Sequence, residues 1–201
     1  MSRELGPTMI NNVNGRRLEW SKYSEVSKGE EEKEEYLLND CSKLTKAIYD
    51  GLDLRVEIRS VIKQQLGDVV LIWDLDSNNN PANNNNNNKT LAGFAICHCG
   101  KGTEAGSSTC YVKFAAVKPS RTDNDVLLPA NNFERLIDAC TSFASEQGLS
   151  RLVAGANTGR RQAYGKMLSK GFRIDMLGVI MQNGNDVGYN RPDVYIIDDW
   201  R

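Results

Sequence analysis

The chain has 201 residues, 40% of them apolar, which is enough to bury one sizeable core. Its 25 basic and 26 acidic side chains give a net charge of -1, so no overall positive field attracts a nucleic acid or an anionic membrane. No apolar run approaches the ~20 residues of a membrane span, and an odd number of five cysteines favours free thiols in a reducing compartment. We therefore expect a soluble, cytoplasmic protein, with the nucleus as an alternative, and neither nucleic acid nor membrane as partner.

The beginning of the chain is mostly polar. Residues 1–35 end in a charged run over 29–35, which cannot offset its ordering entropy by burial. We therefore predict a flexible arm, in which residues 18–20 could form a short first strand. Apolar residues then recur at helical spacing in two segments, 37–51 and 53–67, and each segment ends at a glycine.

Three strands and a long insertion follow. Residues 69–73 are a short apolar strand, and the asparagine-rich tract over 77–89 is predicted to be a loop insertion, because a longer loop adds little closure entropy. Strands over 91–97 and 110–117 flank a glycine-rich turn, which indicates an antiparallel hairpin. One domain over residues 36–201 accounts for all of these elements.

Helices and strands alternate in the second half of the chain. An apolar stripe predicts a helix over 133–148, and residues 152–156 form a short buried strand. A second helix has its inner face over 163–168 and ends at Gly171. The last two strands are expected over 178–182 and 193–198. This alternation indicates an α/β fold.

Several short motifs stand in a characteristic order. They are Val117-Lys-Pro119, Ala144-Ser-Glu-Gln-Gly148, a strand ending at Asn157, Arg160-Arg-Gln-Ala-Tyr164 and Gly171-Phe172. In this order of elements, residues 37–201 resemble the core of the GCN5-related N-acetyltransferase superfamily, and residues 188–201 are similar to an uncharacterised branch of it. The resemblance implies a mixed, mostly antiparallel twisted sheet of about six to seven strands with helices on both faces. It also implies acetyl-CoA as the cosubstrate.

The resemblance places the cofactor along an exposed edge formed by Phe114, Ala115, Ala116 and Val117. Backbone groups there would pair with the two amides of the pantetheine arm, as an added strand does. A backbone N–H beside a bulge in this strand could stabilise the oxyanion formed as an amine attacks the thioester. The alternative is that these residues are a buried strand of the core.

The pyrophosphate of CoA requires converging N–H groups at the start of a helix. The family usually provides an Arg or Gln followed by a Gly-x-Gly pair, and this chain departs from that pattern. Arg121 is separated from the helix by a loop, and Pro129 has no N–H to offer. Asn131, Asn132 and Phe133 can still present N–H groups, and the two asparagines are the candidates for this site. Asn157 could bond the pantetheine, or could only cap the helix that follows it.

Tyr164 is the candidate acid for the departing CoA thiolate. The family tyrosine corresponds to Met167 here, and Tyr164 lies one helical turn earlier on the same face. Its alternative is a tyrosine that packs against the sheet. No general base stands out on the central strand. His98 lies between Cys97 and Cys99, but neighbouring strand residues point to opposite faces, so no metal site is predicted.

The acceptor would be a primary amine on a small molecule or a protein, bound by two loops. The residues implied are Tyr49, Asp53, Tyr189 and Arg191. The acidic and aromatic groups suit an amine and Arg191 suits a carboxylate, although each could equally be part of the loop structure. The sequence thus predicts an acyl-CoA-dependent N-acetyltransferase, monomeric or homodimeric. The alternative is a catalytically degenerate module of the same fold that acts in CoA binding, regulation or protein interaction.

Overall fold

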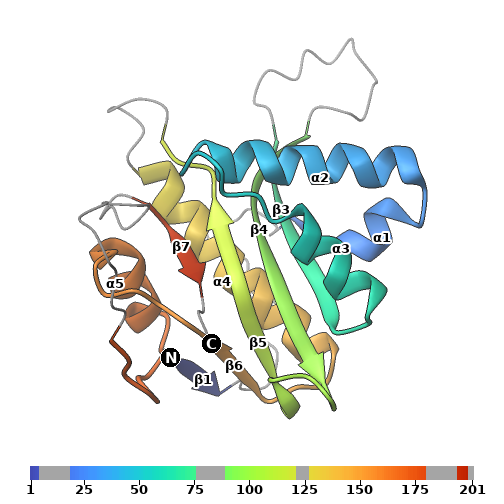
Figure 1. Ribbon diagram of the computed structural model, residues 1–201. Helices are drawn as coiled ribbons and strands as arrows, with labels where there is room; N and C mark the ends of the chain where they lie inside the picture. Colours follow the sequence, from blue (N-terminus) through green and yellow to red (C-terminus); the bar gives the residue numbers. More distant parts are fainter. Residues whose placement is uncertain (5–18, 76–88, 121–126, 180–193, 199–201) are drawn as a thin grey trace.

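The computed structural model describes residues 1–4, 19–75, 89–120, 127–179 and 194–198 (Figure 1). The elements in chain order are β1 (Ser2–Glu4), β2 (Trp20–Lys22), α1 (Tyr23–Ser27), α2 (Glu31–Lys46), α3 (Arg55–Lys63), β3 (Gly67–Leu75), β4 (Lys89–Gly100), β5 (Gly106–Val117), α4 (Leu127–Glu146), β6 (Arg151–Ala154), α5 (Arg161–Ser169) and β7 (Ile196–Asp198).

The strands form one open mixed sheet of seven strands in the order β1-β6-β5-β4-β3-β2, with β7 paired to β5 beside this path. The β5–β6 pair is parallel, and the other pairs among the described residues are antiparallel. The predicted α/β fold with a mixed, mostly antiparallel sheet is confirmed. It is consistent with the fold of the GCN5-related N-acetyltransferases.

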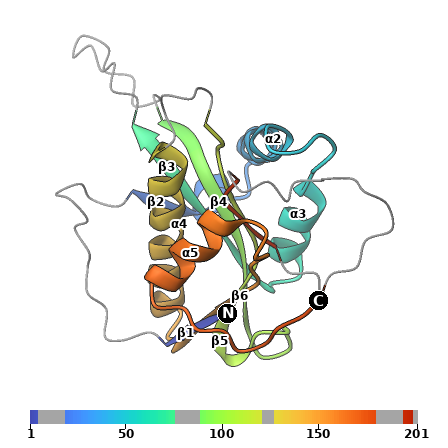
Figure 2. The same cartoon turned by 90° about the vertical axis from the view of Figure 1, so that its left-hand side faces the viewer.

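Helices cover both faces of the sheet. Figure 2 shows α4 and α5 on one side and α2 and α3 on the other. The core under α4 is built around Phe133, Leu136 and Phe143, and the core on the opposite face contains Leu38 and Phe94. Strand residues alternate between the two cores because successive side chains of a strand point to opposite faces.

The flexible arm predicted for residues 1–35 is wrong where the structure describes it. β1 pairs with β6, and β2 pairs with β3, two residues beyond the start of the predicted first strand at 18–20. The charged run begins α2, with three glutamates in its first turn. Acidic side chains are favourable there because they interact with the positive end of the helix dipole. Residues 5–18 of the predicted arm lie outside the described residues.

Other boundaries differ from the predicted ones. Gly67 begins β3 instead of ending a helix, and α4 begins at Leu127, with Pro129 in its first turn, where the missing N–H removes no helical hydrogen bond. The predicted strand over 178–182 is not formed at 178 and 179, and its remainder lies outside the described residues. So does the asparagine tract from 77 to 88.

All five cysteines are free thiols, and four of them are buried. Cys97 lies in the core with its Sγ 4.0 Å from that of Cys140. Contacts with the thiols of Cys110 and Cys140, together with burial, raise the pKa of Cys97, so this thiol stays protonated and unreactive. Among the described residues, no helix has the length and apolar character that a membrane span requires.

Gly67 allows β3 and β4 to approach at their shared end. Its φ is +155°, and a Cβ atom there would lie 1.9 Å from the carbonyl oxygen of Cys97. Cys99 also donates its N–H to the carbonyl of Leu66 over 2.8 Å. A larger residue must therefore push the two backbones apart.

We expect Gly67→Ala to lower the free energy of unfolding by about 1–3 kcal/mol or more, because the added methyl group overlaps the backbone. Gly165→Ala is the matched control, since nothing lies within 4 Å of its Cβ position in α5. That variant should gain about 0.5–1 kcal/mol from helix propensity. Urea unfolding of both variants measures the difference, and equal effects would contradict the close approach at Gly67.

Candidate functional site

The parallel pairing of β5 with β6 ends at Val112 and Ala154, while β5 continues to Val117. At this point the register between β4 and β5 shifts: Ile96 faces Phe114, and Cys97 faces Val112. Lys113 is therefore the extra residue between two consecutive positions of the ladder, and it forms a bulge. A bulge in this strand was expected for an oxyanion-binding N–H, and its presence is confirmed.

The edge of β5 beyond the bulge was predicted to be open for a cofactor, and this is wrong. β7 lies antiparallel along it, with Ala115 opposite Ile197 and Ala116 opposite Ile196. The N–H of Val117 donates to the carbonyl of Tyr195 over 3.3 Å. An unpaired edge is a template for any extended segment, and here the chain's own last strand supplies the partner. Phe114, Ala115, Ala116 and Val117 are all buried.

A buried ion pair holds β7 in place. The guanidinium of Arg160, just before α5, forms a bidentate pair with the carboxylate of Asp198, over 2.6 Å from Nη1 to Oδ1 and 2.7 Å from Nη2 to Oδ2. Arg160 is 1% exposed and Asp198 9%. This arrangement is the strongest geometry available to two charged side chains. It joins the beginning of α5 to the end of β7.

Tyr195 provides a second attachment just before β7. Its hydroxyl donates to Oε1 of Gln162 over 2.5 Å. Its ring packs against Phe133 of α4, with 5.4 Å between the ring centroids. Neither attachment was predicted from the sequence. The one signal for the ion pair was an aspartate at the end of an apolar strand, since a carboxylate buried there requires a partner.

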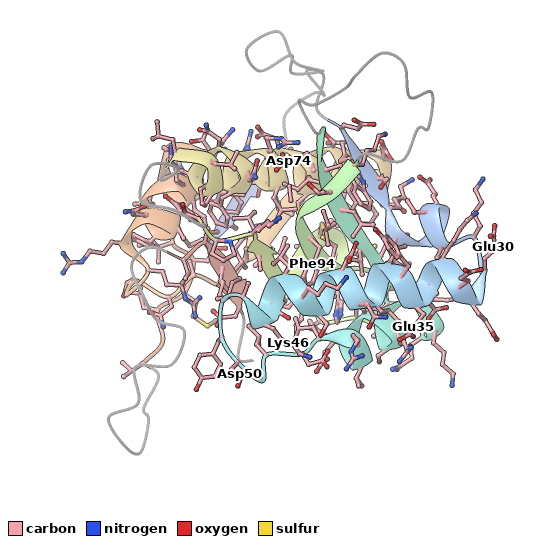
Figure 3. All side chains as sticks on the ribbon, turned by 90° about the horizontal axis from the view of Figure 1, so that it is seen from above. Glu30, Glu35, Lys46, Asp50, Asp74 and Phe94 are labelled. Atoms are coloured by element: carbon pink, nitrogen blue, oxygen red, sulfur yellow. The ribbon has the colours of Figure 1, made fainter. Side chains whose placement is uncertain are left out.

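The two asparagines predicted to bind pyrophosphate do not offer free N–H groups. Both lie in the second turn of α4, where backbone N–H groups donate within the helix. The side chain of Asn132 is buried and accepts a bond from Arg135 Nη1 over 2.7 Å, and Arg135 also pairs with Asp74 over 2.7 Å. Asp74 lies beside α4 (Figure 3). Asn131 is exposed, and Arg121 lies outside the described residues.

Asn157 lies before α5, and Tyr164 lies in the first turn of this helix. Oδ1 of Asn157 accepts the N–H of Gly159 over 2.8 Å. The N-cap residue of α5 is Arg160, so this bond closes a turn before the helix and is not the predicted helix cap. Tyr164 is partly buried and lies beside Ala163, which is buried in the core. Its role as an acid stays a prediction.

The predicted acceptor residues are only partly described. Tyr49 is 43% exposed, and it lies in the loop after α2, where Figure 3 labels Lys46 and Asp50. Asp53 pairs with Arg55 over 2.6 Å and also accepts its backbone N–H, and the hydrogen bond from the Arg55 side chain lowers the pKa of Asp53. Asp53 thus helps to begin α3. Tyr189 and Arg191 lie outside the described residues.

A cluster of titratable side chains lies next to the bulge. Glu104 Oε1 is 3.1 Å from Lys113 Nζ and 3.1 Å from His98 Nδ1. The His98 ring meets Tyr111 edge-on. Burial lowers the pKa of His98, and the charge of Glu104 only partly opposes this shift. A neutral imidazole beside the bulge can accept a proton.

The sequence was interpreted differently for this cluster. His98 was considered only as a metal ligand. Glu104 was assigned to a loop, and it does lie in the turn between β4 and β5, but its position beside His98 was not predicted. The predicted hairpin brought the strands of His98 and Lys113 together, but a bulge leaves no mark in the residue pattern. Among the described residues, no three His, Cys, Asp or Glu side chains are grouped to hold a metal ion.

Comparisons with known proteins bear on the fold. No family model and no curated protein sequence matches the chain. The fold is similar to the crystal structure of a probable acetyltransferase, with 14% sequence identity and a TM-score of 0.50, over 84% of this chain and 97% of that one. TTHA1254 from Thermus thermophilus matches with 15% identity and a TM-score of 0.46, over 76% of this chain and 94% of that one. At these identities the likeness concerns the fold alone.

We expect Asp198→Ala to lower the free energy of unfolding by about 3–5 kcal/mol, because it leaves the buried Arg160 guanidinium without a counter-charge. The double variant Arg160→Met/Asp198→Leu removes both charges and should lose much less. Urea unfolding of the two proteins tests this. If the double variant were as unstable as the single one, the loss of the pair itself, and not the unpaired charge, would explain the lower free energy of unfolding.

We expect stability to fall as the pH drops below about 6.5, in part because of His98. Its pKa is lowered in the folded protein, so the unfolded chain takes up the proton first as the pH falls. His98→Gln removes this contribution and should flatten the curve between pH 8 and pH 5. Urea unfolding across this range is the measurement. Parallel curves for the two proteins would contradict a lowered pKa.

Proposed function

We propose that the chain is an acyl-CoA-dependent N-acetyltransferase, which moves an acetyl group from acetyl-CoA to a primary amine by direct attack. The observation that carries the proposal is the bulge at Lys113, at the point where β5 extends past the end of β6. A bulge leaves a backbone N–H outside the ladder, and such a donor can stabilise a developing oxyanion. The likeness in fold to a probable acetyltransferase supports the same class of reaction.

The residues around the bulge suit this chemistry. The amine must lose a proton as its nitrogen bonds to the acyl carbon, and the C–S bond then breaks to release a thiolate that takes up a proton. His98 has a lowered pKa and is therefore suited to accept the first proton. Tyr164 in α5 is the candidate donor of the second. In this proposal the Glu104 carboxylate, which also pairs with Lys113, lies beside the imidazole of His98.

The edge of β5 can pair with one extended segment at a time. The pantetheine amides would use the groups that Ala115 and Val117 now share with the segment around β7. In this proposal the cosubstrate therefore binds by replacing β7, and the Arg160–Asp198 pair opposes the exchange. The apparent affinity is reduced by the fraction of molecules in which β7 has left.

The second candidate function is a non-catalytic module of the same fold, acting in regulation or protein interaction. It is favoured by the same pairing, since β7 already forms backbone hydrogen bonds with the edge of β5. It is also favoured by the beginning of α4, where Pro129 offers no N–H and the N–H groups of Asn131 and Asn132 are used within the helix.

Calorimetric titration with acetyl-CoA and with CoA separates the two functions. We expect micromolar binding, about -8 kcal/mol, and several-fold tighter binding to Asp198→Asn, which weakens the attachment of β7. Asp40→Asn is the matched control, because it makes the same chemical change in an exposed ion pair of α2. Its affinity should equal that of the unmodified chain.

The outcomes have distinct meanings. Binding with transfer to an amine in a broad panel supports the enzyme. No binding at millimolar ligand, by the unmodified chain or by Asp198→Asn, overturns it in favour of the non-catalytic module. Equal gains in Asp198→Asn and Asp40→Asn would contradict the competition between β7 and the cosubstrate.

A further inference from the structure

Four of the five cysteines lie on the face of the sheet that α4 covers. Cys97, Cys110 and Cys140 belong to the core on this face, and Cys99 packs against it. The fifth, Cys41, lies in the core on the opposite face. Two of the four come from β4 and one from β5, which are neighbouring strands (Figure 1). The β4–β5 hairpin and α4 thus gather four thiols in one region of the molecule.

Cys99 and Cys110 face each other directly across β4 and β5. Opposed residues of an antiparallel pair have α-carbons about 4.5–5.5 Å apart, and a disulfide bond joins residues whose α-carbons are about 4.4–6.8 Å apart. Both side chains lie on the same face of the sheet, so the two sulfur atoms can meet by rotation about the Cα–Cβ bonds. The strand pairing therefore holds these two cysteines at a distance that a disulfide bond can span.

The two thiols differ in access to solvent. Cys110 is 0% exposed, whereas Cys99 is partly exposed. Cys99 lines a hollow of about 460 Å³ between the end of α4, the start of β3 and the end of β4, together with Asp68, Phe143 and Gln147. A small molecule that enters this hollow can therefore reach Cys99 first.

Cys97 and Cys140 are the rival pair, since their sulfur atoms are 4.0 Å apart. Both are buried, at 0% and 2% exposed, and neither is among the residues that line the hollow. Oxidation that starts from solvent therefore begins at Cys99. Of the buried thiols, that of Cys110 lies directly opposite Cys99 in the ladder.

We propose that Cys99 and Cys110 are a redox-sensitive pair, in which a hydroperoxide oxidises Cys99 and Cys110 then closes a disulfide bond. With hydrogen peroxide, the sulfur of Cys99 attacks the O–O bond, an S–O bond forms, and one water molecule leaves. The sulfur of Cys110 then displaces the hydroxyl group of this sulfenic acid, which leaves as a second water molecule. Two thiols lose their hydrogen atoms, and one peroxide is reduced to water. No step depends on the proposed acetyl transfer.

The surroundings of the pair make its oxidation slow and reversible. Burial raises the pKa of Cys99, and the neighbouring Cys110 and Asp68 add to the shift, so little of the reactive thiolate is present at neutral pH. Opposed strand residues have β-carbons about 4.5–5.5 Å apart, which is wider than the ~3.8 Å of a relaxed disulfide. The bridge is therefore strained, and strained disulfides are readily reduced. Such a pair responds to excess peroxide and returns to thiols afterwards.

Treatment of the reduced full chain with millimolar hydrogen peroxide, followed by a thiol count in denaturant, tests the proposal. We expect the count to fall by two, from five, and peptide mapping by mass spectrometry to find a bridge between Cys99 and Cys110. Reduced glutathione should restore the lost thiols. Cys99→Ala should lose no thiol to a disulfide bond. In Cys110→Ala a sulfenic acid should remain at Cys99, where dimedone traps it.

Cys41→Ala is the matched control, because it removes a buried thiol from the opposite face of the sheet. It should lose two thiols, as the unmodified chain does. The peptide map is made on the unmodified chain, so this test does not depend on the folding of any variant. No loss of thiols, a bridge between Cys97 and Cys140, or a bridge that joins two molecules overturns the proposal. An equal loss in Cys99→Ala and in the unmodified chain overturns it as well.

Discussion

The backbone edge of β5 can be hydrogen-bonded to one partner at each position, and this constraint organises the centre of the molecule. β6 occupies the edge up to Val112, and β7 occupies it from Phe114. The bulge at Lys113 lies between the two partners. A bulge bends and twists a strand, so the same residue that interrupts the ladder with β4 also marks the exchange of partners on the other side. Helix α4 packs against β5, and Arg160 joins the start of α5 to the junction.

The Arg160–Asp198 pair favours β7 over any other segment as the partner of this edge of β5. A pair of buried charges contributes little net stability compared with apolar side chains of the same volume, but either charge alone is costly. β7 therefore has one favourable position, in which both charges are satisfied together. If another segment pairs with the edge of β5, the Arg160 guanidinium needs a new counter-charge or contact with water. An anionic ligand would meet this condition more easily than a neutral one.

The sequence predicted the elements whose residue pattern is strong. The strands around Val70, Ala95 and Val112 and the helix stripe through Leu136 were recognised because burial imposes a period on the chain. β1 was missed because it is three residues long and carries no period, and β2, which is equally short, was predicted only as a possible strand over 18–20. The acidic start of α2 resembles a disordered run in composition, and only the helix dipole distinguishes the two cases.

The candidate site was less predictable, for physical reasons that differ from residue to residue. Asn157 was predicted as a possible cap from residue preference alone. The pairing of β7 with β5 joins residues far apart in the chain, and an apolar strand is equally compatible with several neighbours. The register shift at Lys113 depends on how β4 and β5 fit together, so it has no local signal. His98 became informative only when Glu104 and Lys113 were placed beside it.

The position of β1 has a consequence for how the chain folds. The amino group of Met1 donates to the carbonyl of Ala154 over 2.7 Å, across 153 positions of sequence. β2, β3, β4 and β5 follow one another along the sheet and can pair as the chain is synthesised. β1 must wait until β6 has emerged, and the closure of so long a loop slows its docking. The first strand of the chain is therefore one of the later strands to join the sheet, and this edge exists only in molecules whose first and last thirds have met.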